Sequence, residues 1–294
     1  MKYILTTENL TKTYGQKDAA KDINIHIREG SIYGLIGRNG AGKTTVMRMI
    51  SGLSKPTSGT YQMYGEHKFG VGVLIESPGI YPNMSAQENL RLKCIGMGCY
   101  TKEYVQQLLE TVGLENTGKK NAGSFSLGMR QRLGIALALV GDPKMIVLDE
   151  PINGLDPIGV VEIRELIKRL CDEKGMTILI SSHNLPELYQ CATDYIIIDH
   201  GQIKEQITLE ELEEKCKHYL RIETPDAPKL AQVLESKLGT TNFKVMADGS
   251  VQLYDFTDEK EKVTDVLFEN GVKTTGFSLM GETLENYFIS AVGR

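Results

Sequence analysis

The sequence predicts an α/β protein with a mostly parallel sheet, followed by a smaller α+β module. Three observations lead to this prediction. Short apolar runs alternate with helical stretches between residues 31 and 199, as strands and crossover helices do. One apolar run leads into a glycine-rich octet, Gly37 to Thr44. Beyond about residue 215 a second set of short elements begins. A chain of 294 residues is long enough for two domains.

Composition excludes several classes of protein. Hydrophobic residues make up 41% and charged residues 24% of the chain, which is typical of a soluble globular protein. The net charge of -5 argues against a nucleic-acid partner. The five cysteines are scattered without zinc-site spacing, and we expect free thiols in a reducing cytosol. The N-terminus has no signal peptide pattern, and apolar runs such as Ile135 to Val140 are too short to span a membrane.

The N-terminal elements follow from periodicity. Ile23, Ile25 and Ile27 alternate with polar residues, which predicts one half-buried antiparallel strand. Strands are expected over Thr60 to Tyr64 and over Gly70 to Ile75. Residues from about Ser85 to Val140 read as mainly helical and begin with a Ser85…Glu88 capping-box pattern. We expect a helical subdomain at about residues 80–140.

The octet Gly37 to Thr44 fits the phosphate-loop pattern G-x-x-x-x-G-K-[ST] between a predicted strand and a predicted helix. In that setting, glycines let backbone N–H groups cradle phosphates at a helix N-terminus. Lys43 is expected to reach the outer phosphates and the Thr44 hydroxyl to ligate Mg²⁺. The alternative is a glycine-rich turn that binds nothing. The expected nucleotide-binding residues of this segment are Gly37, Arg38, Asn39, Gly40, Ala41, Gly42, Lys43, Thr44 and Thr45.

A second nucleotide motif ends the predicted strand Lys144 to Leu148 with Asp149 and Glu150. The carboxyl end of a parallel strand faces the ligand in such sheets. Asp149 is therefore expected to hold Mg²⁺, and Glu150 to act as the base that orients the attacking water. An acidic turn of purely structural origin is the alternative. A helix over Val160 to Cys171 and strands over Met176 to Ile180 and Tyr195 to Asp199 follow.

A boundary is predicted near Glu210 to His218, which divides a domain at 1–215 from an accessory domain at 216–294. The accessory elements are expected in the order β-α-β-β-α-β, which fits a ferredoxin-like module. The expected ranges are Tyr219 to Glu223, Pro228 to Leu238, a hairpin over Asn242 to Tyr254 around Asp248-Gly249, Glu259 to Asn270, Val272 to Ser278 and Glu282 to Val292. It contains no recognisable catalytic group.

The segment Phe125-Ser126-Leu127-Gly128-Met129 resembles the L-S-G-G-Q signature of the ATP-binding subunits of ABC transporters. Ser126 and Gly128 match the signature, while Leu127 and Met129 depart from it. The resemblance implies that Ser126 and Gly128 contact the γ-phosphate of ATP held by the phosphate loop of a second copy. Without it, Ser126 would be an ordinary helix N-cap.

Other positions resemble the same family one by one, over about residues 3–213. Tyr14 resembles the aromatic residue that stacks on adenine, although a lone tyrosine could equally be core or surface. Asp156, in Asn153-Gly-Leu-Asp156, resembles the loop that couples two sites across a dimer. His183 resembles the switch histidine that bonds the γ-phosphate; an ordinary loop histidine is the alternative. The implied fold is a mixed sheet core with an antiparallel and a helical subdomain.

One position departs from the family. Where its members carry a glutamine that touches Mg²⁺ and senses the membrane subunit, this chain has Glu76. Glutamate binds Mg²⁺ more strongly than an amide does but repels phosphates. The run around Glu76 and the altered signature resemble the subgroup that exports bacitracin and lantibiotics, including self-immunity transporters.

The resemblance implies a homodimeric ATPase that binds ATP and Mg²⁺ and docks, on the cytoplasmic face of the membrane, to separate permease subunits. The chain would power efflux of a peptide antibiotic. Three alternatives stay open: an exporter subunit for another substrate, a soluble ABC ATPase acting on DNA or ribosomes, and a non-hydrolysing regulatory subunit. The acidic charge disfavours the second, and intact Lys43, Asp149, Glu150 and His183 disfavour the third.

Overall fold

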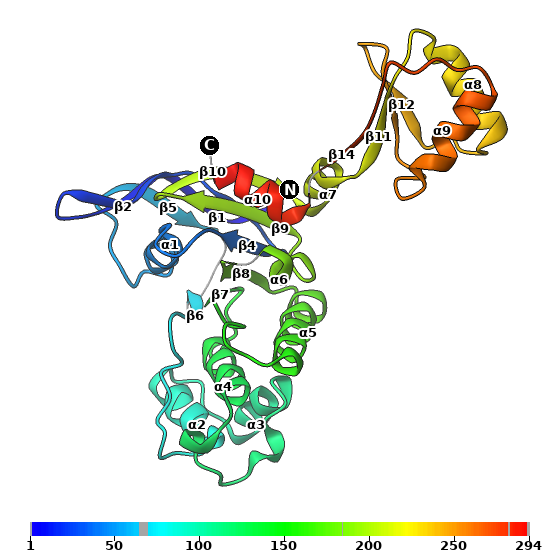
Figure 1. Cartoon of the computed structure of the whole chain (residues 1–294). Coiled ribbons are helices and arrows are strands. Elements are labelled where there is room, and N and C mark those ends of the chain that lie inside the picture. The colour runs from blue at the N-terminus through cyan, green and yellow to red at the C-terminus, as the bar shows by residue number, and fades with distance from the viewer. Residues whose placement is uncertain (1, 65–69, 184, 282, 293–294) are drawn as a thin grey trace. The chain divides into compact units, whose positions relative to one another are not determined.

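The computed structural model describes residues 2–64, 70–183, 185–281 and 283–292. The chain forms two compact units, one of Met1–Leu209 with Ser290–Arg294 and one of Glu210–Ile289. We describe each unit by itself (Figure 1). The second unit therefore ends earlier than the expected accessory domain, because the residues from Ser290 on group with the first unit.

The described strands of the first unit form two sheets. Their bounds are β1 Tyr3–Tyr14, β2 Lys17–Ile23, β3 His26–Arg28, β4 Ile32–Ile36, β5 Ser58–Met63, β6 Val71–Leu74, β7 Met145–Asp149, β8 Thr177–Ser182, β9 Asp194–Asp199 and β10 Gln202–Thr208. The helices are α1 Lys43–Ile50, α2 Ala86–Gly96, α3 Lys102–Thr111, α4 Leu127–Leu139, α5 Pro157–Lys174 and α6 Leu185–Tyr189, with 3₁₀ turns at Glu115–Thr117 and Ala122–Ser124. α7 Leu209–Cys216 and α10 Leu284–Val292 each cross from one unit to the other.

The larger sheet has the strand order β10-β9-β4-β8-β7-β6. The four pairs from β9 to β6 are parallel, and β10 is antiparallel to β9. All residues of β4, β7, β8 and β9 are buried, as expected of strands covered on both faces. The expected mixed sheet is confirmed, although the sequence reading did not include its edge strand β10.

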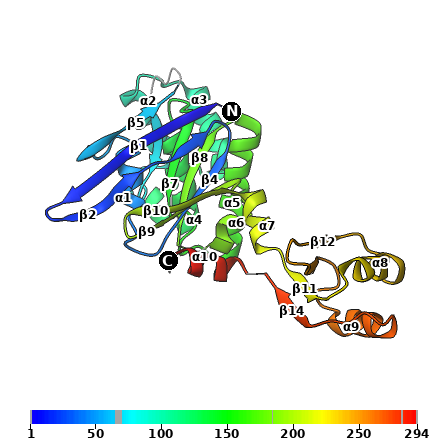
Figure 2. The ribbon, with the colours of Figure 1, turned by 90° about the horizontal axis from the view of Figure 1, so that it is seen from above.

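The second sheet is antiparallel and has β1 at its centre, paired with β2, β3 and β5. Its apolar face, α1 and the parallel sheet share one core that includes Leu5, Ile27, Met47, Val147 and Leu179. Figure 2 shows β1, β2 and β5 lying beside α1.

The prediction of a single strand over residues 23–27 is wrong, because residues 24 and 25 separate β2 from β3. Asn24 accepts a hydrogen bond from the Asn9 backbone N–H at 2.8 Å and donates to the Asp22 carbonyl at 2.9 Å. The Ile25 backbone N–H donates to the Thr7 hydroxyl at 3.0 Å, in place of a regular ladder bond. An asparagine side chain thus competes with the sheet for backbone groups.

Helices α2, α3 and α4 pack together as a helical subdomain, seen at the lower end of the first unit in Figure 1. The predicted capping box at its start is confirmed. The Ser85 hydroxyl accepts from the Glu88 backbone N–H at 3.2 Å, and the Glu88 carboxylate accepts from the Ser85 backbone N–H at 2.8 Å. The predicted helical character of residues 85–140 is confirmed as well.

The second unit contains β11 Tyr219–Glu223, α8 Ala227–Lys237, β12 Phe243–Val245, β13 Val251–Leu253, α9 Lys260–Glu269 and β14 Gly276–Met280. Its sheet is antiparallel, in the order β12-β13-β11-β14. Leu220, Leu230 and Val263 belong to a core of its own. The hairpin at Asp248-Gly249 is confirmed, whereas the last strand starts four residues later than expected. Residue 282, the expected start of the last helix, lies outside the described residues.

Candidate nucleotide site

The phosphate loop joins the end of β4 to the start of α1. An added Cβ at Gly37 would lie 2.4 Å from the Ile198 carbonyl oxygen, and one at Gly42 would lie 2.5 Å from the Ala19 carbonyl oxygen. Gly40 and Gly42 also have φ angles of 80° and 107°, a region that favours glycine. The loop therefore needs glycine at Gly37 and Gly42 for close approach, and at Gly40 for its backbone conformation.

Lys43 is the first residue of α1, and its side chain is buried along the loop. Its ammonium donates to the Gly37 carbonyl oxygen at 2.6 Å and lies 3.5 Å from a carboxylate oxygen of Glu150. The cation is thus held between the loop and the end of β7. An ion pair across this distance joins the two motifs that the sequence suggested separately.

Asp149 and Glu150 stand at the carboxyl end of β7. The Asp149 carboxylate accepts from the Thr44 hydroxyl at 2.7 Å and from the Ser181 hydroxyl at 2.6 Å, and it is buried. The Glu150 carboxylate accepts from the Asn153 amide at 3.0 Å. The φ angle of Glu150 is 47°, unusual for a residue with a side chain.

His183 follows β8 and lies next to Glu150. The distance from His183 Nδ1 to a Glu150 carboxylate oxygen is 3.3 Å. The Glu150 backbone N–H donates to the Ser181 hydroxyl at 2.8 Å. Residues at the ends of two neighbouring strands, β7 and β8, therefore fix the glutamate from both its backbone and its side chain.

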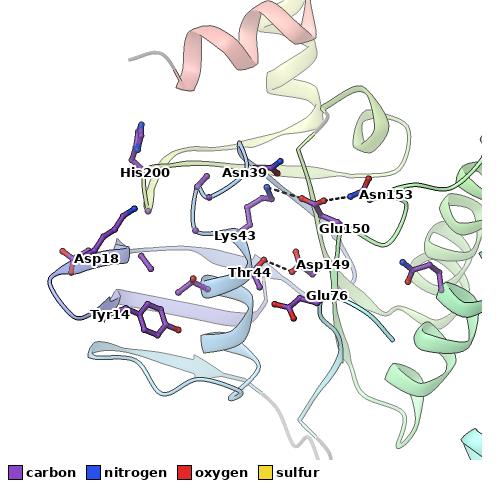
Figure 3. A pocket seen from close by; sticks show the side chains of 18 residues that line it. Tyr14, Asp18, Asn39, Lys43, Thr44, Glu76, Asp149, Glu150, Asn153 and His200 are labelled. Atoms are coloured by element: carbon purple, nitrogen blue, oxygen red, sulfur yellow. Dashed lines mark hydrogen bonds and ion pairs between the residues drawn. The ribbon is translucent and has the colours of Figure 1, made fainter. Parts of the chain in front are cut away.

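A cavity of about 850 Å³ opens beside these residues. Figure 3 shows Tyr14 and Asp18 on one side of it and Glu76, Asp149 and Glu150 on the other. The expected residues that line it are Tyr14, Asn39, Gly40, Ala41, Gly42, Lys43, Thr44, Thr45, Glu76, Asp149 and Glu150. Tyr14 is 52% exposed, so its ring is open to a flat ligand. Gly37, Arg38 and His183 adjoin the cavity residues without lining the cavity.

Seven residues that line the cavity were not among the site residues expected from the sequence: Lys17, Asp18, Ala19, Gln131, Asn153, His200 and Gly201. They come from β2, α4 and the turns after β7 and β9; Asn153 stands in the segment that resembles the coupling loop, and the other six belong to no motif found in the sequence. Gln131 is buried, and its side-chain oxygen has no hydrogen-bond partner among the described residues. Only its place five residues after Ser126, on the helix behind the signature, could have drawn attention to it.

Ser126, Gly128 and Asp156 lie outside this cavity. Ser126 is exposed and caps α4 by accepting from the Met129 backbone N–H at 3.2 Å. Asp156 caps α5 by accepting from the Gly159 backbone N–H at 3.1 Å. The two helix starts are neighbours, since an added Cβ at Gly128 would lie 3.8 Å from Leu155. The structure thus groups these residues with one another and not with the phosphate loop of the same chain.

Glu76 follows β6 and lines the cavity beside Thr44 and Asp149 (Figure 3). Its carboxylate accepts from the Arg48 guanidinium on α1 at 2.5 Å. Arg48 was not among the expected site residues. The φ angle of Glu76 is 64°, so this residue too has a left-handed conformation.

The cluster fits ATP with a magnesium ion. The Thr44 hydroxyl and the Asp149 carboxylate are oxygen ligands of the kind that Mg²⁺ prefers. No group of three or more His, Cys, Asp or Glu residues suited to a metal ion occurs in the part of the chain that the structure describes. Mg²⁺ commonly needs no such cage, because substrate phosphates and water complete its shell.

The fold, the loop and the acidic strand end define a P-loop ATPase of the cassette class. The ABC transporter family model matches residues 20–153. The bacitracin transport ATP-binding protein BcrA of Bacillus licheniformis is 40% identical over 301 residues, covering 100% of this chain and 98% of the relative. The lantibiotic transport ATP-binding protein SrtF of Streptococcus pyogenes is 42% identical over 219 residues, covering 72% of this chain and 95% of the relative.

A solved structure agrees with the fold. The dimeric post-hydrolysis state of the ATP-binding cassette MJ0796, bound to ADP and Pi, superposes with a TM-score of 0.62 at 25% identity and covers 70% of this chain and 98% of that chain. This chain belongs to the ABC transporter ATP-binding proteins, and it is an ATP-hydrolysing subunit of that family. Among the described residues, no helix is both long and apolar enough to cross a membrane.

Proposed function

We propose that this chain powers the export of a peptide antibiotic, of the bacitracin or lantibiotic type, through a separate membrane permease. The observation that carries the proposal is the 40% identity to a bacitracin transport protein over the full length, second unit included. The name of the lantibiotic transport relative points to the same class of substrate. In this role the chain lies on the cytoplasmic face of the membrane and confers resistance or immunity.

We assign the roles in hydrolysis as follows. Tyr14 stacks on adenine, and residues 37–45 hold the phosphates through backbone N–H groups and the Lys43 ammonium. Thr44 and Asp149 hold Mg²⁺, which neutralises charge on the phosphates when it is bound. Glu150 orients and deprotonates the attacking water, and His183 stays beside it to bond the γ-phosphate. The 3.3 Å contact between His183 and Glu150 supports this pairing.

We infer that two copies of the chain form the working unit. Ser126 and Gly128 of one copy face the phosphate loop of the other, and Asp156 couples the two sites. Two observations support this inference. These residues lie outside the cavity of their own chain, and the solved cassette with the same fold is a dimer. In an exporter, closure of the dimer would drive the permease and hydrolysis would reopen it.

The Glu150→Gln variant tests the catalytic assignment. Loss of the base should lower the turnover number at least about a hundredfold while ATP still binds. Because ATP then persists between the copies, the variant should elute as a dimer with ATP and as a monomer without it in size-exclusion chromatography. Hydrolysis by the variant at the wild-type rate would show that Glu150 is not the base.

The substrate class is tested in a sensitive bacterial host that expresses this chain with its permease. Minimal inhibitory concentrations should rise for bacitracin or for a lantibiotic, and Lys43→Ala, which removes the phosphate contact, should abolish the rise. A panel of unrelated drugs tests the second candidate function, which is export of another substrate. Protection against such a drug alone would overturn the peptide-antibiotic proposal and leave the ATPase assignment intact.

We also propose that the second unit is a ferredoxin-like module that acts as an accessory domain to an ATPase domain spanning residues 1–215. Its β-α-β-β-α-β order and antiparallel sheet support that description.

A further inference from the structure

Four carboxylates line the cavity that would receive a highly charged triphosphate, and three of them, those of Glu76, Asp149 and Glu150, lie across it from Asp18 (Figure 3). Each makes a different set of contacts. Asp149 accepts from two hydroxyls, and Glu150 lies 3.5 Å from the Lys43 ammonium. Glu76 forms an ion pair with the Arg48 guanidinium, at 2.5 Å. A negative charge so near phosphates needs a compensating cation, and Arg48 is placed to be that cation.

The position of Arg48 relates it directly to the proposed metal ligands. Arg48 comes four residues after Thr44 on α1, so the two side chains share one face of the helix. Glu76 reaches that face from the end of β6, from a backbone with a φ angle of 64°. Such a left-handed conformation is disfavoured for a glutamate, and it persists where the surroundings hold it. The ion pair with Arg48 is one such constraint.

We propose that Arg48 is a positioning residue of the nucleotide site: it holds Glu76 and neutralises its charge, and so controls how far Glu76 can help to bind Mg²⁺. The idea rests on the proposed ATP and Mg²⁺ site, and it does not depend on the exported substrate. It explains how a third carboxylate is accommodated beside Asp149 and Glu150.

The Arg48–Glu76 ion pair predicts two opposite effects on nucleotide binding when Arg48 is replaced. Without the guanidinium, the Glu76 carboxylate repels a nucleotide that carries no metal, so metal-free binding weakens. The same carboxylate becomes available to the metal, so the complex with Mg²⁺ is not weakened. The dependence of nucleotide binding on Mg²⁺ therefore increases, and this coupling is a ratio of two dissociation constants.

Isothermal titration calorimetry of the full chain with a non-hydrolysable ATP analogue measures both constants, one with excess Mg²⁺ and one with EDTA. For Arg48→Met, the constant in EDTA should rise about two- to fivefold, the range for a partly exposed ion pair. The constant with Mg²⁺ should stay level or fall. The conservative variant Arg48→Lys should stay near the wild type. In the Glu76→Gln background, Arg48→Met should no longer change the ratio.

Arg91→Met is the matched control, because Arg91 lies on α2 with its guanidinium over the Tyr100 ring. Arg48→Gln serves as a second variant if Arg48→Met does not fold. An unchanged ratio in the Arg48 variant, or the same change with and without Glu76, would overturn the proposal. If the wild-type chain binds the analogue equally well with Mg²⁺ and with EDTA, the metal site itself is wrong. The assignment of the exported substrate would be unaffected in either case.

Discussion

At the residue scale, three of the seven described non-glycine residues with positive φ angles, Glu76, Glu150 and His200, line the nucleotide cavity. Glu76 and Glu150 have φ angles of 64° and 47°, and both line it. Residues with side chains avoid this region, at a cost of roughly 1 to 3 kcal/mol each. Because both residues lie beside the phosphate loop, we infer that the strained backbone serves to position their carboxylates in the cavity.

Alanine at two positions of the loop should separate close approach from backbone conformation. Gly37→Ala should abolish nucleotide binding, because its Cβ would lie 2.4 Å from the Ile198 carbonyl oxygen. Gly40→Ala meets nothing within 4 Å and carries only the strain of a φ angle of 80°, about 1 to 2 kcal/mol. Fluorescent ATP binding should therefore survive, weakened, in Gly40→Ala alone. Equal binding by the two variants would contradict the role of close approach.

Gln131 should prove unfavourable for stability in the absence of nucleotide. Its buried side-chain oxygen has no partner among the described residues, and a buried unpaired oxygen costs about 1 to 3 kcal/mol. Gln131→Leu should therefore leave the free energy of unfolding in urea unchanged or raise it by about 1 kcal/mol. A loss of more than about 2 kcal/mol, as expected for a broken network, would mean that the amide is satisfied in solution.

The sequence predicted Lys43, Thr44, Asp149 and Glu150 as site residues because each has a fixed place in a short local motif. It could not identify Arg48, whose partner is 28 residues away and is brought near only by the sheet. Gln131 was missed for the same reason. Residues that meet through tertiary packing leave no periodic or motif signal, and a family resemblance supplies only positions that the family shares.

At the element scale, strand ends assemble the site. β4, β7 and β8 are neighbours and parallel, so their carboxyl ends present the phosphate loop, Glu150 and His183 together. Most elements were predictable because their apolar periodicity is strong. The edge strand β10 was missed because its two apolar residues, Ile203 and Ile207, stand four apart and give no clear alternation along the sequence. The break between β2 and β3 depends on the side chain of Asn24, which periodicity does not register.

The capping box makes a quantitative prediction for the helical subdomain. Ser85→Ala should lower the free energy of unfolding by about 1 kcal/mol, because the Glu88 backbone N–H at the start of α2 loses the hydroxyl that accepts from it and the Glu88 carboxylate loses a donor. Hydrogen bonds from Ser85 hold the pKa of Glu88 below its usual value. A lowered folded-state pKa stabilises the protein above the unfolded pKa, and this contribution is lost as the pH falls through the folded pKa.

The difference between wild type and Ser85→Ala should therefore shrink in acid. Urea denaturation at neutral pH and near pH 3, read by circular dichroism, measures it. Thr101→Ala, which removes the cap of α3 without a capping box, is the control. A difference that grows in acid would contradict the ionised role of Glu88.

At the scale of the whole molecule, the chain carries two separate cores. The second unit has its own buried cluster, including Leu220, Leu234 and Val251. The sequence predicted a domain boundary within the charged helical stretch Glu210 to His218, and the second compact unit begins at Glu210. The return of the last residues to the first unit was not predicted, because it depends on contacts that α10 makes only in the fold. One such contact joins the Arg38 guanidinium to the Val292 carbonyl at 3.4 Å.

Because the two units have separate hydrophobic cores, we expect each unit to unfold without the other. Leu220→Ala should destabilise the second unit by about 2 to 5 kcal/mol, since a fully buried leucine leaves a cavity. Hydrogen exchange read by mass spectrometry should quicken in peptides from residues 219–280 and stay unchanged in β4 and β8. Leu179→Ala, in the core of the first unit, should give the reverse pattern. Faster exchange throughout the chain in both variants would show one cooperative unit.

The strand order has a further consequence for how the protein is made. β4, which leads into the phosphate loop, bonds to β8 and β9, and both are encoded more than 140 residues after it. While the ribosome is still adding those residues, the apolar strand Ile32–Ile36 has neither of its neighbours. A nascent chain therefore carries a complete phosphate-loop sequence long before it can bind ATP. Until β9 emerges from the ribosome, the nascent chain exposes an apolar, aggregation-prone strand of the kind that chaperones protect.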